Sequence, residues 1–235
     1  MKFLYVFPHP DDESFGPGPG INSQLRDGHE VYLLTLTRGE ATSIRHKLGL
    51  DKQQMGEVRY REMQCVSQVY GLTGMTVLNL PDGGLKELDP REIEHAVEKH
   101  VREIEPQILI TYPAHGISGF HDHLIAHAVV KRVFCQLRED GADYLRRLAF
   151  FTVDEQTAKN NRGAIRLNHS TAAEIDCRFV VDDQDLNAFN RALDCYGTYR
   201  EVVEKSKVRE SVSREICYEI FGEEHDPPLE DPVEF

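Results

Sequence analysis

Short apolar runs alternate with longer stretches of helical periodicity over the first 150 residues. Five runs have the length and flanking turn residues of buried strands: residues 3–7, 30–37, 76–80, 107–112 and 147–153. Between them, apolar spacing and start or stop signals predict four helices: residues 21–26, 53–70, 90–104 and 123–137. This alternation predicts an α/β fold, a Rossmann-like, mostly parallel sheet with helices on both faces.

The last third of the chain has a weaker pattern. Residues 182–205 are typical of one long helix, and residues 221–235 form an acidic, proline-containing tail that we expect to be irregular. We expect a single domain over residues 1–235, with residues 1–150 as its α/β core.

Parallel sheets of this kind bind ligands at the carboxyl ends of their strands, near a topological switch point. The loop after the first strand contains His9, Asp11 and Asp12. His9 and Asp12 are three residues apart, so one tight turn can aim both at a metal ion, and imidazole and carboxylate are proper zinc ligands. A free Asp11 beside them would be placed to act as a general base on a metal-held water. Alternatively, these carboxylates only stabilise a helix N-terminus.

The loop after the fourth strand is rich in histidine. It carries His115, His121 and His123, with His127 one helical turn later. A catalytic zinc usually takes three protein ligands, so this loop could supply the third. Asp122 is a plausible N-cap for the helix that follows. Two histidines one turn apart are, by themselves, more often a solvated helix surface than a metal site.

Five sequence blocks resemble the LmbE/PIG-L family of zinc-dependent deacetylases, which hydrolyse the N-acetyl group of N-acetylglucosamine-containing (GlcNAc) substrates. In chain order they are VFPHPDDE at residues 6–13, TRGEA at 37–41, VRYRE at 58–62, LPDGGL at 80–85 and GISGFHDH at 116–123. The blocks occur in the family's order and at comparable spacing, over about the first 130 residues.

The resemblance implies a hydrolase with one Zn²⁺ per chain, although other divalent metals fit such ligands too. The implied metal ligands are His9, Asp12 and His123. Asp11 would be the general base for a metal-held water that attacks the amide, and Arg59 and Asp82 would contact the sugar. Glu40 would contact residues of the site rather than the substrate itself.

One position departs from the family pattern. Many relatives carry a histidine three residues before the third ligand, where it is proposed to act as an acid or to stabilise the tetrahedral intermediate. Here that residue is Phe120, which cannot donate a proton. His121 is therefore our candidate catalytic acid, with His115 or backbone N–H groups as alternatives for holding the oxyanion.

Composition narrows the partners and the compartment. Lys and Arg number 27 against 40 Asp and Glu, a net charge of −13, which argues against nucleic acid and anionic membranes as partners. A small-molecule amino sugar is the expected partner, and the chain could form a homo-oligomer. The five cysteines are odd in number and include no CxxC pair, so we expect unpaired thiols in a reducing, cytoplasmic environment. We see no signal peptide and no membrane span.

Three other functions stay open at this stage. The first is a zinc amidase or deacylase acting on a non-sugar amide or a thiol conjugate. The second is a non-catalytic metal- or sugar-binding protein, because of Phe120. The third is a nucleotide-binding transferase, although Gly16, Gly18 and Gly20 do not form the GxGxxG spacing of a dinucleotide site.

Overall fold

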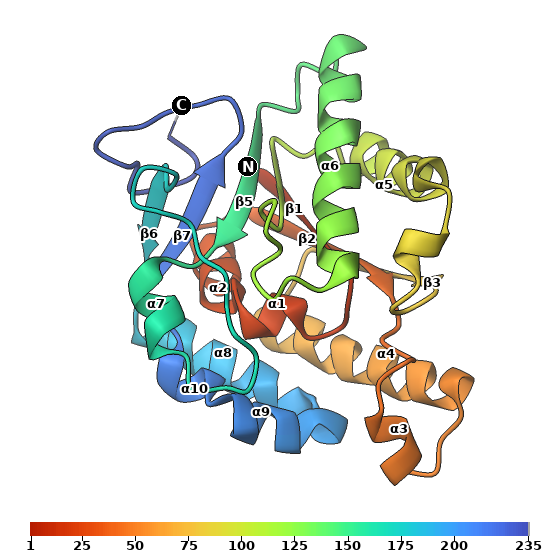
Figure 1. Ribbon diagram of the computed structural model, residues 1–235. Helices are drawn as coiled ribbons and strands as arrows, with labels where there is room; N and C mark the ends of the chain where they lie inside the picture. Colours follow the sequence, from red (N-terminus) through yellow and green to blue (C-terminus); the bar gives the residue numbers. More distant parts are fainter. Residues whose placement is uncertain (235) are drawn as a thin grey trace.

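The computed structural model describes residues 1–234, which form a seven-stranded sheet flanked by helices (Figure 1). The strands are β1 (Lys2–Phe7), β2 (Glu30–Thr37), β3 (Gly74–Leu80), β4 (Ile108–Thr111), β5 (Arg147–Thr152), β6 (Cys177–Val180) and β7 (Glu215–Ile220). Their order across the sheet is β3-β2-β1-β4-β5-β7-β6. Strands β1 to β5 pair in parallel, whereas β7 is antiparallel to both β5 and β6. The predicted α/β class and mostly parallel sheet are confirmed.

Ten α-helices lie within the described residues 1–234. They are α1 (Asp12–Phe15), α2 (Gly18–Arg26), α3 (Ile44–Lys47), α4 (Lys52–Tyr70), α5 (Pro90–Ile104), α6 (His121–Glu139), α7 (Glu155–Asn160), α8 (Asp183–Cys195), α9 (Arg200–Ser206) and α10 (Val208–Ser211). Two short 3₁₀ turns, η1 (Leu85–Glu87) and η2 (Gly197–Tyr199), complete the set.

Strand β1 lies at the centre of the sheet and is buried on both faces. Phe3, Tyr5 and Phe7 point into one apolar cluster, which also contains side chains of α2, α4 and α8. Leu4 and Val6 point into a second cluster, built with α5 and α6. These two helices lie on the same side of the sheet (Figure 1). A strand covered on both faces is apolar at every position rather than at alternate ones, which explains the uninterrupted run in the sequence.

The strand order reverses at β1. The chain first adds β2 and β3 on one side of β1, and then crosses over to place β4 and β5 on the other. The loops after β1 and β4 therefore leave the sheet in different directions and open a crevice between them. This is the edge on which the sequence placed both histidine-containing loops.

The predicted helix over residues 182–205 is wrong as a single element. Helix α8 ends at Cys195, and Tyr196 takes a non-helical conformation with φ −83° and ψ 66°. The buried Tyr196 hydroxyl donates a hydrogen bond to Glu13 Oε1 at 2.5 Å and accepts one from the backbone N–H of Asp11 at 2.9 Å. These contacts with the β1 loop hold Tyr196 in place and separate α8 from η2 and α9.

Strands β6 and β7 were not predicted. In β7, Ile216, Tyr218 and Ile220 face the first cluster, but Glu215 and Glu219 interrupt the apolar pattern on the other face. The tail is irregular as expected over residues 221–234, apart from one bridge that joins Leu229 to Cys177 of β6.

The expectation of unpaired thiols is wrong for two of the five cysteines. Cys65 of α4 and Cys195, the last residue of α8, form a disulfide with Cα atoms 5.7 Å apart. The two cysteines are 130 residues apart in sequence, and only the packing of α8 against α4 brings them together. Cys135, Cys177 and Cys217 are free thiols. The cytoplasmic location stays a prediction.

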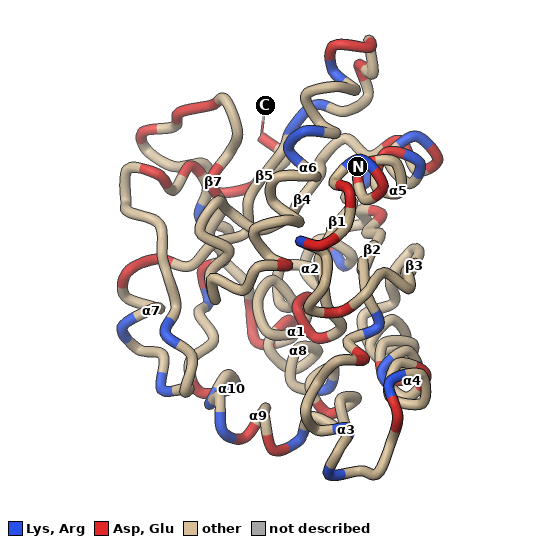
Figure 2. The backbone as a smooth tube through the Cα atoms, turned by 45° about the vertical axis from the view of Figure 1, so that its right-hand side comes forward, with Lys and Arg blue, Asp and Glu red and all other residues tan. Residues whose placement is uncertain are grey.

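Acidic residues are distributed along helices and loops, and most helices carry Lys or Arg as well, whereas residues 221–234 carry acidic residues without Lys or Arg (Figure 2). Among residues 1–234, no helix combines the length and the apolar character needed to cross a bilayer.

The contact between α2 and α8 depends on one buried carboxylate, and its removal is testable. Asp185 is 1% exposed, and its Oδ1 accepts hydrogen bonds from Asn22 Nδ2 at 2.8 Å and Arg26 Nη1 at 2.9 Å. We expect Asp185→Ala to lower the free energy of unfolding by about 2 kcal/mol, because it leaves the buried Asn22 amide without this acceptor. The control Asp183→Ala removes an 81% exposed side chain, paired only at the surface with Arg214, and should cost under about 1 kcal/mol. Urea unfolding measures the free energy of unfolding of both variants. Equal losses would contradict the role of Asp185 in the contact between α2 and α8.

Candidate metal centre

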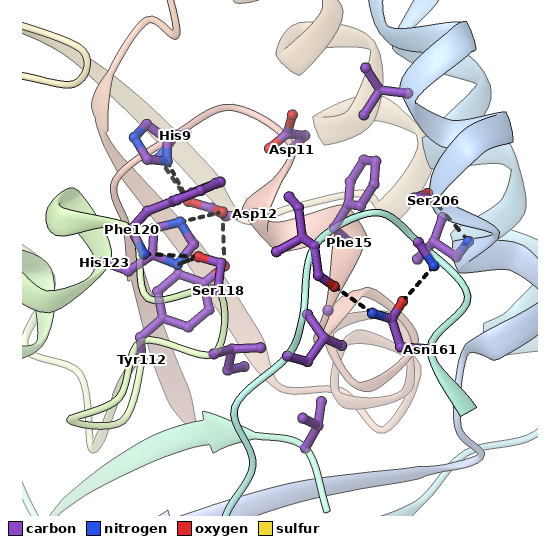
Figure 3. Close-up of a pocket in the computed structure, with 18 of the residues that line it drawn as sticks. His9, Asp11, Asp12, Phe15, Tyr112, Ser118, Phe120, His123, Asn161 and Ser206 are labelled. Carbon is purple, nitrogen blue, oxygen red and sulfur yellow. Dashed lines mark hydrogen bonds and ion pairs between the residues drawn. The ribbon is translucent and has the colours of Figure 1, made fainter. Parts of the chain in front are cut away.

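Three side chains from the loops after β1 and β4 meet at the switch point. His9 lies in the β1 loop, Asp12 begins α1, and His123 lies in the first turn of α6. One ligand atom from each lies within 4.8 Å of the other two. His9 Nδ1 is 3.5 Å from Asp12 Oδ2, and His123 Nε2 is 3.4 Å from Asp12 Oδ1 (Figure 3).

These separations fit a divalent metal. Two nitrogen or oxygen ligands at about 2.0–2.1 Å from a tetrahedral zinc lie about 3.3 Å from each other. The donor set of two imidazoles and one carboxylate is also the type that catalytic zinc sites use, with one position left open. The residues present therefore fit a zinc ion.

The outer nitrogen of each histidine is occupied by a protein acceptor. His123 Nδ1 donates to the carbonyl oxygen of Gly116 at 2.9 Å, and His9 Nε2 donates to Asp122 Oδ2 at 3.2 Å. With these outer nitrogens engaged, His123 Nε2 and His9 Nδ1 are the nitrogens left for a metal, and both face Asp12. Such outer partners orient metal-binding histidines and raise their basicity.

The backbone of both loops is strained where it presents these groups. Asp11 has a φ of 92° and Ile117 a φ of 55°, in a region that residues with a side chain rarely adopt. Gly116, with a φ of 62°, must be glycine for a further reason, since a Cβ there would lie 2.9 Å from Cβ of His123. The close approach lets the Gly116 carbonyl reach the His123 ring.

Burial and charge set the protonation states of the three side chains. Burial lowers the pKa of His123, which favours the neutral ring that can bind a metal. Burial would raise the pKa of Asp12, but the neighbouring His123 and His9 outweigh it and lower that pKa. Burial alone would lower the pKa of His9, but its hydrogen bonds to Asp12 and Asp122 raise it well above its usual range.

Asp12 has a further partner that the sequence did not indicate. The buried Tyr112 hydroxyl, just after β4, donates to Asp12 Oδ1 at 2.8 Å. The Tyr112 ring stacks on the His123 ring with centroids 4.2 Å apart and planes at 9°. Tyr112 therefore positions two members of the trio at once.

Asp11 lies beside the trio but outside it. Its Oδ2 accepts a hydrogen bond from Arg59 Nη2 at 3.0 Å, and the same Nη2 donates to the carbonyl oxygen of Pro10 at 2.6 Å. Arg59 is 1% exposed, and its guanidinium lies 3.7 Å from the ring centre of Tyr199. Burial raises the pKa of Asp11 to about 6, against the opposing charge of Arg59.

Two more carboxylates approach His9 from the opposite side. Asp82 Oδ1 and Asp122 Oδ2 lie 3.4 Å and 3.2 Å from His9 Nε2. Asp82 is held by the backbone N–H of Ala41 at 2.7 Å, and Glu40 accepts from the backbone N–H of Asp82 at 2.9 Å. His9, Asp82 and Asp122 thus form a second group with metal-binding geometry, which shares His9 with the first.

The predicted role of Asp122 as a helix N-cap is wrong. Helix α6 begins two residues earlier than expected, at His121, and Phe120 occupies the N-cap position. Asp122 instead accepts hydrogen bonds from the backbone N–H groups of Gly83 at 2.8 Å and Leu85 at 3.3 Å. Its carboxylate joins the loop after β3 to His9. In the sequence, only the position of Asp122 next to His123 indicates that it lies at the site.

The remaining histidines differ in their access to the site. His121, the first residue of α6, is exposed and lines the cavity beside the trio. Phe120, 50% exposed, lies edge-on to the His123 ring at 5.6 Å. His115 is hydrogen-bonded to Ser170 Oγ at 3.2 Å, and His127 donates to the carbonyl oxygen of Tyr112 at 2.9 Å. Neither of these last two lines the cavity within the described part of the chain.

The cavity has a volume of about 800 Å³. Each of the five sequence blocks contributes to its wall, through His9, Gly39, Arg59, Asp82 and His121. Residues predicted as base, metal ligands and sugar contacts therefore line one cavity.

The sequence matches a protein family described as "PIG-L: GlcNAc-PI de-N-acetylase" over residues 4–134. The chain belongs to this family. The matched segment runs from β1 into α6 and contains all three members of the trio.

Individual relatives in the PIG-L family agree with this assignment. The chain is 29% identical over 168 residues to a 1D-myo-inositol 2-acetamido-2-deoxy-alpha-D-glucopyranoside deacetylase of Kineococcus radiotolerans, covering 60% of this chain and 46% of that protein. It is 30% identical over 152 residues to a Mycothiol S-conjugate amidase of Streptomyces coelicolor, covering 57% and 52%. The chain thus spans about half the length of these relatives. Among solved structures, the zinc-inhibited form of teicoplanin deacetylase Orf2 has the same fold, with a TM-score of 0.69 over 94% of this chain and 97% of that one, at 12% identity.

Proposed function

We propose that this PIG-L family chain is a zinc-dependent de-N-acetylase that acts on a small GlcNAc-containing molecule. The observation that carries the proposal is the trio of His9, Asp12 and His123, in which one ring nitrogen of each imidazole approaches one buried carboxylate. Its position in the cavity lined by the family's sequence blocks supports the same function. We propose that the three residues hold one zinc ion per chain.

When bound, zinc would supply Lewis-acid chemistry, polarising the amide carbonyl and making water acidic enough to act as a nucleophile near neutral pH. Asp11 is the proposed general base, which takes the proton of the attacking water. Its hydrogen bond to Arg59 fixes the carboxylate at the cavity wall while it leaves Oδ1 for that proton. The hydrolysis releases acetate and a free amine.

We propose that Arg59 and Asp82 contact the sugar, and that His121 donates the proton to the departing amine. Arg59 Nη1 is buried without a hydrogen-bond partner within residues 1–234, which supports a role in binding a substrate oxygen. His121 lines the cavity and is exposed, so it can exchange its proton with solvent between turnovers. Phe120 beside it supplies no proton.

The similarity to the Mycothiol S-conjugate amidase favours a second candidate, an amidase that acts on a thiol conjugate. The chemistry and the proposed residues would be the same, but the acyl group released would differ. A panel of N-acetyl sugars, N-acyl sugar conjugates and non-sugar amides distinguishes the two candidates. Turnover of the conjugates alone would favour the amidase.

The ligand assignment predicts a loss of metal. We expect His9→Ala and His123→Ala each to weaken zinc binding by more than about 100-fold, because each removes one of three proposed ligands. His95→Ala is the matched control, since its exposed side chain lies on α5 and does not line the cavity, and it should keep zinc. Zinc per chain after dialysis, measured by mass spectrometry, gives the result. Retention of one zinc by both ligand variants would overturn the assignment.

The role of Asp11 predicts a variant that binds metal but does not turn over substrate. Asp11→Asn keeps the shape of the side chain and removes its capacity to accept a proton, so kcat should fall by about 10²–10⁴-fold with zinc content unchanged. Asp183→Asn makes the same chemical change at an exposed site and should leave kcat as it is. Acetate release measures both rates. Near-full activity of Asp11→Asn would show that another group is the base.

A further inference from the structure

The cavity has two chemically different ends. At one end lie the trio, Asp11 and Arg59, all charged or polar. The other end lies beyond Phe15, towards Asn161 and Ser206 (Figure 3). We call this second end the apolar lobe, and define it by six residues that line it: Phe15, Phe151, Ile165, Val208, Val212 and Ile216.

The walls of the apolar lobe are continuous with the hydrophobic core. Phe151 of β5 and Ile216 of β7 belong to the first core cluster. Phe15 and Val212 pack against a third cluster, formed by α8, α9 and Val208. These five side chains are anchored in packed clusters and keep their positions, so this part of the lobe is already formed without a ligand, whereas Ile165 is 46% exposed and lies in none of the clusters.

A glycine allows the closest contact in this wall. A Cβ at Gly16 would lie 2.4 Å from Cε1 of Phe151, so any side chain there would displace the ring. Gly16 follows α1, whose first residue is Asp12. The apolar wall therefore begins one helical turn from the proposed metal centre, within reach of one extended ligand.

Polar side chains near the lobe are already hydrogen-bonded to the backbone. Asn161 Nδ2 donates to the carbonyl oxygen of Ile165 at 2.6 Å, and its Oδ1 accepts from the N–H of Gly163 at 3.1 Å. The hydroxyls of Ser206 and Ser211 donate to backbone carbonyls at 2.9 Å and 3.0 Å. These groups have little capacity left for a polar ligand.

The charged groups on the rim of the lobe are paired as well. Asp154 and Glu215 both lie within 3.4 Å of Arg178 Nη1. Lys205 lies 3.4 Å from Glu201. The apolar lobe thus contrasts with the metal end, where Arg59 Nη1 has no partner in the described residues.

The cavity is larger than one amino sugar requires. A cavity of about 800 Å³ lies towards the upper end of the range of about 300–1,000 Å³ that accommodates drug-sized ligands. One amino sugar is smaller than such a ligand, so a ligand that fills the cavity extends beyond the sugar. The rest of the volume is bounded by hydrocarbon, and would hold a hydrocarbon group more favourably than water.

We infer that the apolar lobe binds an alkyl or aryl substituent carried by the amino-sugar substrate. The inference rests on the proposed function for the identity of the sugar end, and adds the class of group attached to it. The substituent is either an acyl chain on the amine nitrogen or an apolar aglycone on the anomeric carbon. Both present the same chemistry to the lobe.

Binding to the metal-stripped chain tests the lobe independently of hydrolysis. One arm compares methyl, butyl and hexyl glycosides of GlcNAc; the other compares methyl glucosaminides that carry N-acetyl, N-butanoyl and N-hexanoyl groups. Calorimetry should show Kd falling about fourfold for each added methylene in one of the two arms, which identifies the source. Equal Kd values for short and long ligands in both arms, or no binding of any long-chain ligand, would overturn the inference.

Variants of the lobe should remove this gain. Ile165→Asn changes a side chain that is 46% exposed, and Val212→Asn one that is half-buried. Each should weaken binding of the favoured hexyl or hexanoyl ligand by about 5- to 20-fold. Val180→Asn is the matched control, because Val180 is 67% exposed and borders a different surface pocket. If Val212→Asn fails to fold, the Kd of Ile165→Asn alone tests the inference. An unchanged Kd for either folded variant would contradict binding of the substituent in the apolar lobe.

Failure of the lobe and failure of the proposed function give different results. Chain-length-dependent binding, together with no acetate release by the zinc-loaded protein, would support the apolar lobe as a binding site and contradict the proposed de-N-acetylase activity. Acetate release at a rate independent of chain length, with the same Kd for short and long ligands, would support the proposed de-N-acetylase activity and contradict the apolar lobe as a binding site.

Discussion

The Asp12 carboxylate links the parts of this molecule that carry its chemistry. It is buried at the start of α1, and a buried carboxylate is costly unless other groups compensate its charge and hydrogen-bonding capacity. His9 approaches one oxygen, while His123 and Tyr112 approach the other. The loops after β1 and β4 and the first turn of α6 therefore converge on one point. Strain at Asp11 and Ile117 is tolerated because this convergence holds both loops in place.

Around Asp12 the protein separates two tasks between adjacent residues. Asp12 faces the two histidines, whereas Asp11 turns to the buried Arg59. The left-handed conformation of Asp11 lets consecutive carboxylates point to different partners. Arg59 is in turn fixed by Tyr199, and Tyr196 bonds the backbone of Asp11. The region that follows α8 thus supports the proposed base, and this explains why the predicted long helix is interrupted there.

The parallel half of the fold could be predicted because its signals are local. Strand β1 is apolar throughout because both of its faces are covered, and α5 has the same bounds in the sequence pattern and in the structure, with Asp89 as its cap. What could not be predicted depends on contacts between distant segments. The Cys65–Cys195 disulfide needs α4 and α8 to be packed together, and Asp122 has the sequence context of a helix cap until the loop after β3 is seen to donate to it. Tyr112 is indistinguishable from a core aromatic residue until its hydroxyl meets Asp12.

The two ends of the cavity come from different parts of the chain, and this division has a consequence. The segment that matches the PIG-L family, residues 4–134, contains the trio, Asp11, Arg59 and Asp82. The apolar lobe takes only Phe15 from that segment; its other five defining residues lie between Phe151 and Ile216. Strand β7 pairs antiparallel with β5, with Tyr218 opposite Phe151 and Ile216 two residues away on the same face of β7. A sheet extended in this way adds a wall to the cavity without disturbing the parallel strands that position the metal ligands. On our proposal, residues outside the family match therefore set which substituent is accepted, while the matched segment holds the proposed reacting groups in place.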